Sequence, residues 1–347
     1  MATMLEQYGI DPGVRDEAAR HRGTVGRVTR IDRGAYHVVT DVGSVVASLA
    51  GGLKDAPEPE DRPAIGDWVV LVDDVVEVIL ARRSAFRRGD ADRLQAQVVA
   101  ANVDVVFIVH AADEPANVRR LERELSLAFD SGAEPVVLLT KVDLCEPSGF
   151  DEVVADFRRV APDVEIVATS AVDHRGLDAI EALACRRTVA FVGKSGVGKS
   201  SLVNELLGDA TQAVGDVRAS DGRGRHTTTH REMFMLPGGG VVIDTPGLRS
   251  IGMWQNDEGI ARVFADIEAI AAQCRFRDCI HEHEPGCAVQ AAVEAGSLDP
   301  ARVANHRAML SELDDLDRES QLRSRLEKKR HAKILSKAVR SFDRKPR

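Results

Sequence analysis

Short runs of alternating apolar and polar residues dominate the first part of the chain. The runs are separated by turn residues and cover residues 23–31, 35–40, 44–49, 67–71 and 75–80. Alternation with a period of two predicts β-strands that bury one face. Five short strands spaced so closely are typical of a small Greek-key barrel. We predict an OB-fold barrel at residues 23–86, preceded by an N-terminal extension of residues 1–22.

From about residue 98 the pattern changes to longer apolar runs separated by helical periodicity. The apolar runs cover 103–109, 135–139, 165–168, 189–192 and 240–243, and helical patterns occupy 117–131 and 200–207. Strands that alternate with helices are typical of βαβ units and a parallel sheet. We predict an α/β domain at residues 87–255 and a small helical domain at residues 256–347.

Composition narrows the class of protein. The chain has 347 residues, 44% hydrophobic and 29% charged, which suits a globular protein with two or three domains. It has no apolar run of the roughly 18 residues that a membrane span needs, and its first residues do not resemble a signal peptide. We therefore expect a cytoplasmic protein with no membrane partner. The net charge of −9 argues against indiscriminate nucleic-acid binding but permits local basic contacts.

The turn after the apolar run 189–192 has the chemistry of a phosphate-binding loop. It reads Gly-x-x-x-x-Gly-Lys-Ser between a predicted strand and a predicted helix. Its glycines permit positive φ angles, so that backbone N–H groups can contact phosphates. The lysine reaches the β- and γ-phosphates, and the serine hydroxyl binds Mg²⁺. The predicted nucleotide-binding residues are Gly193, Lys194, Ser195, Gly196, Val197, Gly198, Lys199, Ser200 and Ser201, with Lys199 also catalytic and Ser200 a magnesium ligand.

Two motifs that suit a guanine base precede this loop. The first is a variant of Asn-Lys-x-Asp at the end of a buried strand and consists of Thr140, Lys141, Val142 and Asp143. Asp143 would accept two N–H bonds from guanine, while the methylenes of Lys141 cover the ring. A purine with the opposite donor pattern would leave the buried carboxylate unpaired. Ser170 and Ala171, at the next strand end, would place a backbone N–H near the guanine O6.

Two motifs that suit the γ-phosphate follow the phosphate loop. A segment rich in glycine and arginine ends in three threonines, and Asp244-Thr-Pro-Gly247 closes a strand. Asp244 would hold Mg²⁺ through water, and the amide of Gly247 would sense the γ-phosphate. As the second magnesium ligand we favour Thr229 over Thr227 and Thr228, because the next strand begins directly after it.

The order of these motifs is reversed relative to an ordinary GTPase, in which the phosphate-reading motifs come first. We therefore predict a circularly permuted GTPase domain. The residue after Gly247 is Leu248, where many GTPases have a water-orienting glutamine, so intrinsic hydrolysis should be slow. His226, beside the threonines, is our candidate for the catalytic residue that orients the water. The alternative is a solvent-facing loop histidine.

Three of the five cysteines lie in one short stretch with the spacing Cys274-x₄-Cys279-x-His281-x₅-Cys287. In a cytosolic chain such clustering favours a metal site over disulfides. Three thiolates and one imidazole suit a structural, tetrahedral Zn²⁺. His283 is a rival to His281, and the spacing alone leaves this choice open.

Two basic features could contact RNA. A helical pattern at residues 302–326 leads into a tail rich in lysine and arginine, which favours contact with a phosphate backbone. The barrel region also contains arginines, although the acidic stretch 58–61 opposes such contact, so the barrel is either an RNA-binding or a packing domain. These arginines are Arg27, Arg30, Arg33, Arg82, Arg83, Arg87 and Arg88.

Together, the barrel, the permuted motifs and the cysteine–histidine element resemble the bacterial ribosome small-subunit-dependent GTPase A family over nearly the whole chain. The resemblance rests on residues 193–201, 224–229, 244–247 and 279–281. It implies a GTPase that acts late in maturation of the 30S subunit and is stimulated by it. It further implies contact with the subunit and its 16S rRNA through the barrel and the zinc domain.

The resemblance also bears on single residues. It selects His281 over His283 as the zinc ligand and aligns the family's histidine with His226. At Thr140 the family commonly has asparagine, which braces the phosphate loop, so threonine would loosen the site slightly without altering the guanine assignment. The implied ligands are GTP or GDP with Mg²⁺, and one structural Zn²⁺ per monomer.

Two other functions fit parts of the sequence. The first is an RNA-binding adaptor that is regulated by guanine nucleotides and hydrolyses GTP only incidentally. The second is an ATPase of nucleic-acid repair, which Asp143 opposes. Turnover measured with and without 30S subunits separates the GTPase from the adaptor.

Overall fold

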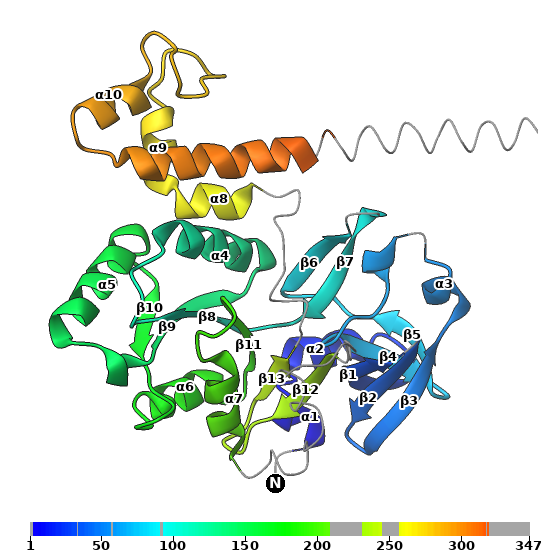
Figure 1. The fold of residues 1–347 in the computed structure, drawn as a ribbon. Coiled ribbons are helices and arrows are strands. Elements are labelled where there is room, and N and C mark those ends of the chain that lie inside the picture. Colours follow the sequence, from blue (N-terminus) through cyan, green and yellow to red (C-terminus); the bar gives the residue numbers. More distant parts are fainter. Residues whose placement is uncertain are drawn as a thin grey trace, which may run out of the picture.

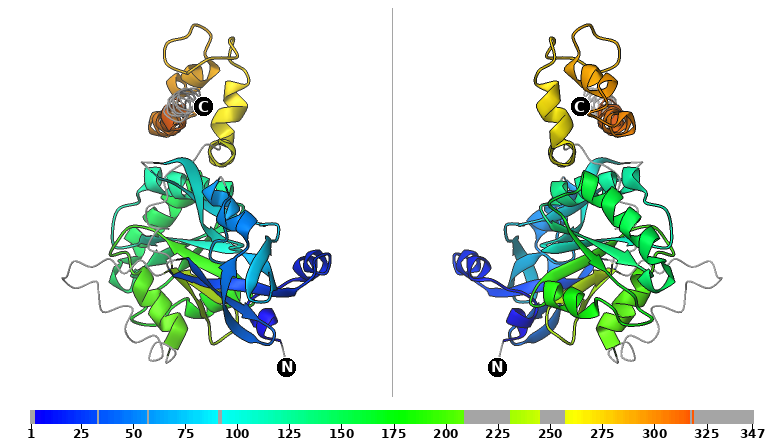
Figure 2. Two further views of the ribbon diagram at one scale, coloured as in Figure 1. Left: turned by 90° about the vertical axis from the view of Figure 1, so that its right-hand side faces the viewer. Right: turned by 90° about the vertical axis from the view of Figure 1, so that its left-hand side faces the viewer.

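The computed structural model describes residues 3–32, 34–56, 58–90, 93–208, 231–244, 257–316 and 318. Figure 1 shows a β-barrel, an α/β part beside it, and a group of helices that packs against one side of the α/β part. These C-terminal helices and the N-terminus lie at opposite ends of the molecule (Figure 2).

The barrel contains the five predicted strands. They are β1 (Thr24–Asp32), β2 (Ala35–Thr40), β3 (Gly43–Leu49), β4 (Trp68–Val72) and β5 (Val75–Ile79), with α3 (Gly51–Lys54) and η1 (Pro59–Asp61) between β3 and β4. β1 pairs with both β2 and β4, while β5 joins β3 to β4, so the strands close on themselves. Val28, Val38, Val69 and Val76 are buried together inside the barrel.

Two short helices, α1 (Met4–Gln7) and α2 (Pro12–Ala18), cover part of the outer face of the barrel. The side chains of Thr3 and Asp11 cap their first turns by accepting hydrogen bonds from backbone N–H groups. The apolar residues shared by helices and barrel are Leu5, Ile10, Val14, Trp68, Val70 and Leu80. The N-terminal extension is therefore packed on the barrel.

The α/β part has a central sheet covered by helices on both faces. Its strands are β8 (Val105–Ala111), β9 (Glu134–Thr140), β10 (Glu165–Ala168), β11 (Thr188–Val192), β12 (Arg231–Met235) and β13 (Val241–Asp244). They lie in the order β10-β9-β8-β11-β13-β12, and all neighbours are parallel except β12 with β13. The helices are α4 (Val118–Ser131), α5 (Pro147–Val160), α6 (Leu177–Ala184) and α7 (Lys199–Leu207), with the short η2 (Val142–Leu144).

Successive residues of the central strands face opposite sides of the sheet, as the strand period requires. Val106 and Ile108 of β8 pack in one cluster with residues of α4 and α5. Val105 and Phe107 pack in a second cluster with residues of α6 and α7. The predicted α/β architecture is confirmed.

A hairpin of β6 (Ala85–Asp90) and β7 (Arg93–Ala101) connects the barrel to β8 and was missed by the sequence analysis. The sequence analysis recognised the apolar run that begins at residue 103 but not the strand that ends just before it. Asn102, with φ of 53°, lies between β7 and β8 and separates the two strands. The predicted boundary at residue 86 falls inside β6.

The C-terminal helices are α8 (Glu258–Val263), α9 (Ala265–Ala271), α10 (Ala288–Glu294) and a helix at residues 300–316. They share the core of the α/β part, because their apolar residues pack in the same cluster as those of α4. Arg302 donates to the buried carboxylate of Glu122 at 2.5 Å, and Arg123 forms two bonds of 2.6 Å with Glu312. Two ion pairs thus join α4 to the last described helix.

Several arginines of the barrel region hold the structure together. Arg82 pairs with the buried Asp67 at 2.7 Å, and Arg83 bridges Asp11 and Asp104. Arg27 is fully buried, Arg33 lies outside the described residues, and Arg88 is exposed. The number of arginines in the sequence therefore overstates the basic surface available to RNA.

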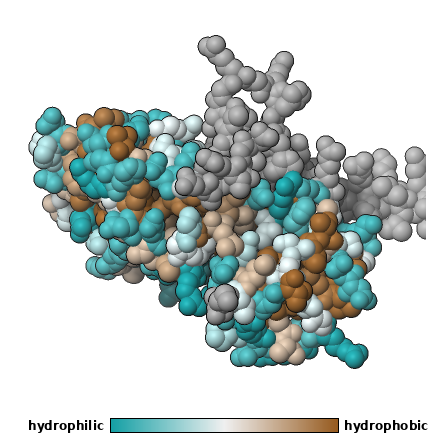
Figure 3. Space-filling view, turned by 90° about the horizontal axis from the view of Figure 1, so that it is seen from below, coloured by the Kyte–Doolittle hydropathy of each residue, from teal (hydrophilic) through white to brown (hydrophobic). Residues whose placement is uncertain are grey.

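In the view of Figure 3, hydrophobic residues gather on the barrel lobe, whose exposed valines include Val42, Val46 and Val72.

Within the part of the chain that the structure describes, no helix is long and apolar enough to cross a membrane.

Arg27 joins three segments of backbone at the junction of the barrel and the α/β part. Its guanidinium donates to the carbonyl oxygens of Tyr8, Gly66 and Asn102, and it lies 4.8 Å from the ring centroid of Trp68. Burial lowers the pKa of Arg27 to about 10. The group stays charged at neutral pH, and its N–H bonds offset the cost of burying that charge.

We expect Arg27→Met to lower the free energy of unfolding by about 3 kcal/mol, because buried carbonyl oxygens lose their donor while the side-chain volume is kept. Urea denaturation measures this loss. Arg15→Met is the control, since the Arg15–Asp41 pair is exposed and should contribute less than about 1 kcal/mol. Equal losses in the two variants would contradict a structural role for Arg27.

Candidate functional site

The glycine-rich loop connects the end of β11 to the start of α7 and lies at the carboxyl edge of the sheet. Gly193, Gly196 and Gly198 have φ angles of 140°, 83° and 101°, in the region that favours glycine. At Gly193 a Cβ atom would lie 2.4 Å from the carbonyl oxygen of Val109, so β8 leaves no space for a side chain. Glycine is required there both by conformation and by close approach of the backbone.

Lys199 is the first residue of α7 and its side chain lies across the loop. Its ammonium group donates to the carbonyl oxygens of Gly193 at 2.7 Å and Lys194 at 2.6 Å. The residue is buried, so the charge is held within the concave side of the loop. Ser200 and Ser201 follow in the first turn of α7 and are exposed.

Thr140 connects the base-reading strand to the phosphate loop. It is the last residue of β9, and its hydroxyl lies within hydrogen-bonding distance of the carbonyl oxygens of Val197 and His110. A hydroxyl has one proton to donate, so these two carbonyl oxygens share a single donor. Thr140 thus contacts the phosphate loop, which is the contact that the sequence analysis expected from an asparagine at this position.

The rest of the base motif and the Ser-Ala loop lie side by side. The N–H of Val142 donates to the carbonyl oxygen of Thr169, which directly precedes Ser170. The hydroxyl of Ser170 accepts from the N–H groups of Val172 and Asp173, and so holds its own loop in a turn. The base motif, the Ser-Ala loop and the phosphate loop therefore lie at the same carboxyl edge of the parallel sheet, where ligands bind in open α/β sheets.

The side chains around this edge differ in how they are held. Lys141 adopts a left-handed conformation with φ of 58°, and its ammonium lies 3.5 Å from Asp113. Asp143 is exposed in η2, and Ala171 is half-buried. Asp113 was missed by the sequence analysis, and its position two residues after the end of β8, at the same edge, is the signal that could have found it.

Part of the predicted γ-phosphate machinery lies outside the described residues. Asp244 is the last residue of β13, at the same edge of the sheet as the phosphate loop. The predicted residues outside the description are His226, Thr227, Thr228, Thr229, Gly247 and Leu248, together with the basic tail from residue 319 onward.

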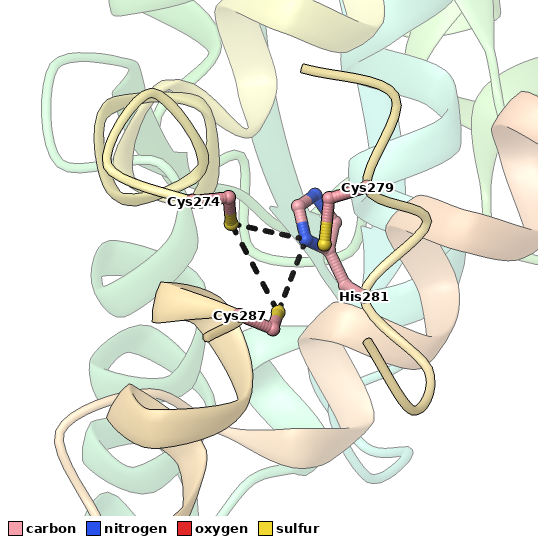
Figure 4. Close-up of side chains that lie close together, drawn as sticks. All are labelled: Cys274, Cys279, His281 and Cys287. Atoms are coloured by element: carbon pink, nitrogen blue, oxygen red, sulfur yellow. Dashed lines mark hydrogen bonds between the residues drawn. The ribbon is translucent and has the colours of Figure 1, made fainter. Parts of the chain in front are cut away.

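Four metal-ligand side chains come together in the C-terminal part. Figure 4 shows Cys274, Cys279, His281 and Cys287 pointing toward one another, and their ligand atoms all lie within 4.8 Å of each other. Nδ1 of His281 is 3.6 Å from the sulfur of Cys274 and 3.4 Å from that of Cys287. His283 is exposed and is not part of this cluster.

The loop that carries His281 is held by a residue that the sequence analysis missed. The carboxylate of Glu284 accepts hydrogen bonds from the N–H groups of Ile280, Glu282 and His283. This ring of bonds supports the left-handed conformation of His281, whose φ is 60°. An acidic side chain that accepts hydrogen bonds from nearby backbone N–H groups cannot be recognised from a single sequence, because it looks like any other surface acidic residue.

The family model described as RsgA GTPase matches residues 79–254. The small ribosomal subunit biogenesis GTPase RsgA of Streptomyces coelicolor is 40% identical over 332 residues, which is 93% of this chain and 90% of that protein. The chain belongs to the RsgA GTPase family. Another relative, the small ribosomal subunit biogenesis GTPase RsgA 2 of Lactiplantibacillus plantarum, is 40% identical over 322 residues, or 90% of each chain.

Solved structures of similar proteins agree with this assignment. YjeQ from Thermotoga maritima superposes with a TM-score of 0.62 at 26% identity, covering 84% of this chain and 98% of that one. YloQ, described as a circularly permuted GTPase, gives a TM-score of 0.60 at 26% identity, covering 85% and 96%. The predicted family, the permuted fold and the GTPase class are confirmed.

For this RsgA-family GTPase we expect Thr140→Val to weaken GTP binding about tenfold, because the loop loses one buried hydrogen bond without a change of side-chain shape. Titration with a fluorescent GTP analogue measures the Kd. Thr140→Ser keeps the hydroxyl and should remain within about twofold of the wild type. Wild-type affinity in Thr140→Val would show that Thr140 does not brace the site.

Proposed function

We propose that this protein hydrolyses GTP during late maturation of the small (30S) ribosomal subunit, and that the subunit stimulates hydrolysis. The observation that carries the proposal is the hydrogen bond from the hydroxyl of Thr140, in the base motif, to the carbonyl oxygen of Val197, in the phosphate loop. The names of the relatives, small ribosomal subunit biogenesis GTPases, support the same function.

Guanine selection is assigned to the loops after β9 and β10. Asp143 would accept the two N–H groups of the base, and the stem of Lys141 would cover one ring face, while Val142, the first residue of η2, is buried. Ser170 and Ala171 would present a backbone N–H to the guanine O6. Because Asp143 can pair fully only with guanine, ATP would be a poor substrate.

Phosphate binding is assigned to the loop of residues 193–201. Its N–H groups would hold the β-phosphate, and Lys199 would exchange its two carbonyl acceptors for phosphate oxygens. Ser200 and Thr229 would bind Mg²⁺, with Asp244 acting through water, and the ion would neutralise charge on the phosphates. The N–H of Gly247 would contact the γ-phosphate.

The attacking water needs a partner, since Leu248 cannot form a hydrogen bond with it. His226 lies in the segment that precedes the threonines and has a ring nitrogen that can orient water. We assign it this role. Hydrolysis would be slow until contact with the subunit holds the loop in place.

The donor set of the C-terminal cluster fits Zn²⁺. A tetrahedral site with Zn–S bonds of about 2.3 Å places two sulfurs about 3.8 Å apart. The sulfurs of Cys274 and Cys287 are 3.9 Å apart. Cys274, Cys279, His281 and Cys287 would therefore hold one structural ion with no open position.

The small subunit and its 16S rRNA are the proposed partners, and the barrel and the C-terminal part are the proposed contact regions. Since several barrel arginines are engaged in ion pairs, exposed Arg88 and the basic tail are the better candidates for phosphate contacts. We propose that the protein acts in the cytoplasm as a monomer.

Turnover of GTP with and without purified 30S subunits tests the function. We expect subunits to raise the rate by about a thousandfold or more, because a supplied or ordered catalytic group raises the rate by roughly 10³–10⁵ in other GTPases. His226→Ala should keep GTP affinity and subunit binding but lose most of this stimulation.

Lys199→Ala is the comparison, because it should impair GTP binding itself. Full stimulation of His226→Ala would mean that another group positions the water. Binding of RNA without any stimulation of the wild type would favour the adaptor function.

Metal analysis tests the zinc assignment. We expect one zinc per chain in the wild type and in His283→Ala, and loss of zinc together with a lower unfolding temperature in His281→Ala, because the metal supplies folding free energy to this small region. Equal zinc content in the two variants would contradict the choice of His281.

A further inference from the structure

Strand β1 pairs both with strands of the barrel and with a strand of the GTPase domain. Its first half pairs with β4 and closes the barrel, from Thr24 opposite Leu71 to Arg27 opposite Trp68. Its second half pairs with β12 of the GTPase sheet, with Arg30 opposite Glu232. The barrel and the GTPase sheet therefore form one continuous sheet of eleven strands.

The change of partner coincides with an irregularity in the strand. The register between β1 and β2 shifts between Val28 and Arg30, as in a β-bulge. A bulge bends a strand and increases its twist, which lets the second half leave β4 and reach β12. On the barrel side of this bulge Arg27 ties β1 to the backbone of Gly66 and Asn102.

The register places the tip of the β1–β2 hairpin at the nucleotide edge of the sheet. Glu232 lies between two partners, with Arg30 opposite it on β1 and Asp244 opposite it on β13. Arg231, where β12 begins, is opposite Ile31 and follows Thr229 by two positions. The barrel hairpin thus lies where the proposed hydrolytic segment enters the sheet.

Side chains at this junction are linked as well. Nε of Arg30 lies 2.6 Å from the carboxylate of Asp32, and its NH1 lies 3.9 Å from the carboxylate of Glu232. The ring of His37 lies 3.2 Å from the same carboxylate of Asp32. Arg30 therefore stands between a carboxylate of the hairpin and one of the GTPase sheet.

We propose that the β1–β12 ladder carries the effect of subunit contact at the barrel to GTP hydrolysis, with Arg30 and Glu232 as positioning residues. The inference rests on the proposed stimulation by the 30S subunit. Contact of the subunit with the β1–β2 hairpin changes or fixes the position of the part of β1 beyond the bulge. Because this part of β1 pairs with β12, and β12 pairs with β13, the effect on position reaches the start of β12 and Asp244. Neither positioning residue needs to touch the nucleotide.

Charge reversal at the two positions tests the proposal. Arg30→Glu and Glu232→Arg each place like charges directly opposite one another, which disfavours cross-strand pairing. Each should lower the ratio of subunit-stimulated to unstimulated turnover by about three- to tenfold, and the double variant should restore most of it. GTP affinity and the Kd for the 30S subunit are measured in parallel.

The two reversals change the net charge of the protein in opposite directions. If these residues contacted RNA directly, the two reversals would have opposite effects, whereas loss of the coupling between β1 and β12 lowers the ratio in both. Arg15→Glu is the matched control, since the Arg15–Asp41 pair is similarly exposed and lies away from β12; its ratio should equal the wild-type ratio. Wild-type ratios in both reversals, effects of opposite sign, or no recovery in the double variant would each overturn the inference. A wild type that subunits do not stimulate would overturn the proposed function and this inference together.

Discussion

The relation of the barrel to the GTPase sheet depends on one buried guanidinium. Arg27 donates to carbonyl oxygens from the N-terminal extension, the barrel and the segment that enters β8. A buried charge without partners would cost several kcal/mol, so the group is stable only when all three segments are in place. This requirement fixes the first half of β1, and with it the direction in which the strand leaves the barrel toward β12.

The nucleotide edge follows from a second constraint, the parallel pairing of β8, β9 and β11. In-register parallel strands end at the same edge, so the segments after Thr140 and Val192 become neighbours although about fifty residues separate them. The hydroxyl of Thr140 then spans the remaining gap to Val197. Circular permutation changes the order in which these segments occur along the chain but leaves their arrangement at the sheet edge intact.

The C-terminal part shares the core of the α/β part and is held at two places. Its apolar residues extend the cluster that covers α4, and Arg302 meets Glu122 at this interface. Burial raises the pKa of Glu122, opposed by its hydrogen bonds with Asn305 and Arg302. At the far end, the four convergent ligands suit a metal cross-link. The chain between β13 and α8 therefore joins the nucleotide edge to a region that is anchored on the same core.

The sequence by itself determined the motifs and the types of element. Glycines at positions 193, 196 and 198, the aspartate of the base motif and the spacing of the cysteines are local patterns with a local physical cause, and they could be interpreted without knowing the fold. The reversed motif order likewise established the permutation, because it is a property of the chain alone.

Only the tertiary structure decided which partners distant residues have. Arginines that looked available to RNA, such as Arg82 and Arg83, proved to pair with Asp67, Asp11 and Asp104. A single sequence carries no signal for such long-range pairs, because burial and charge pairing depend on how separate elements pack. The same reason applies to β1: its residues predict a strand, but only packing determines that half of it closes a barrel and half of it extends the GTPase sheet.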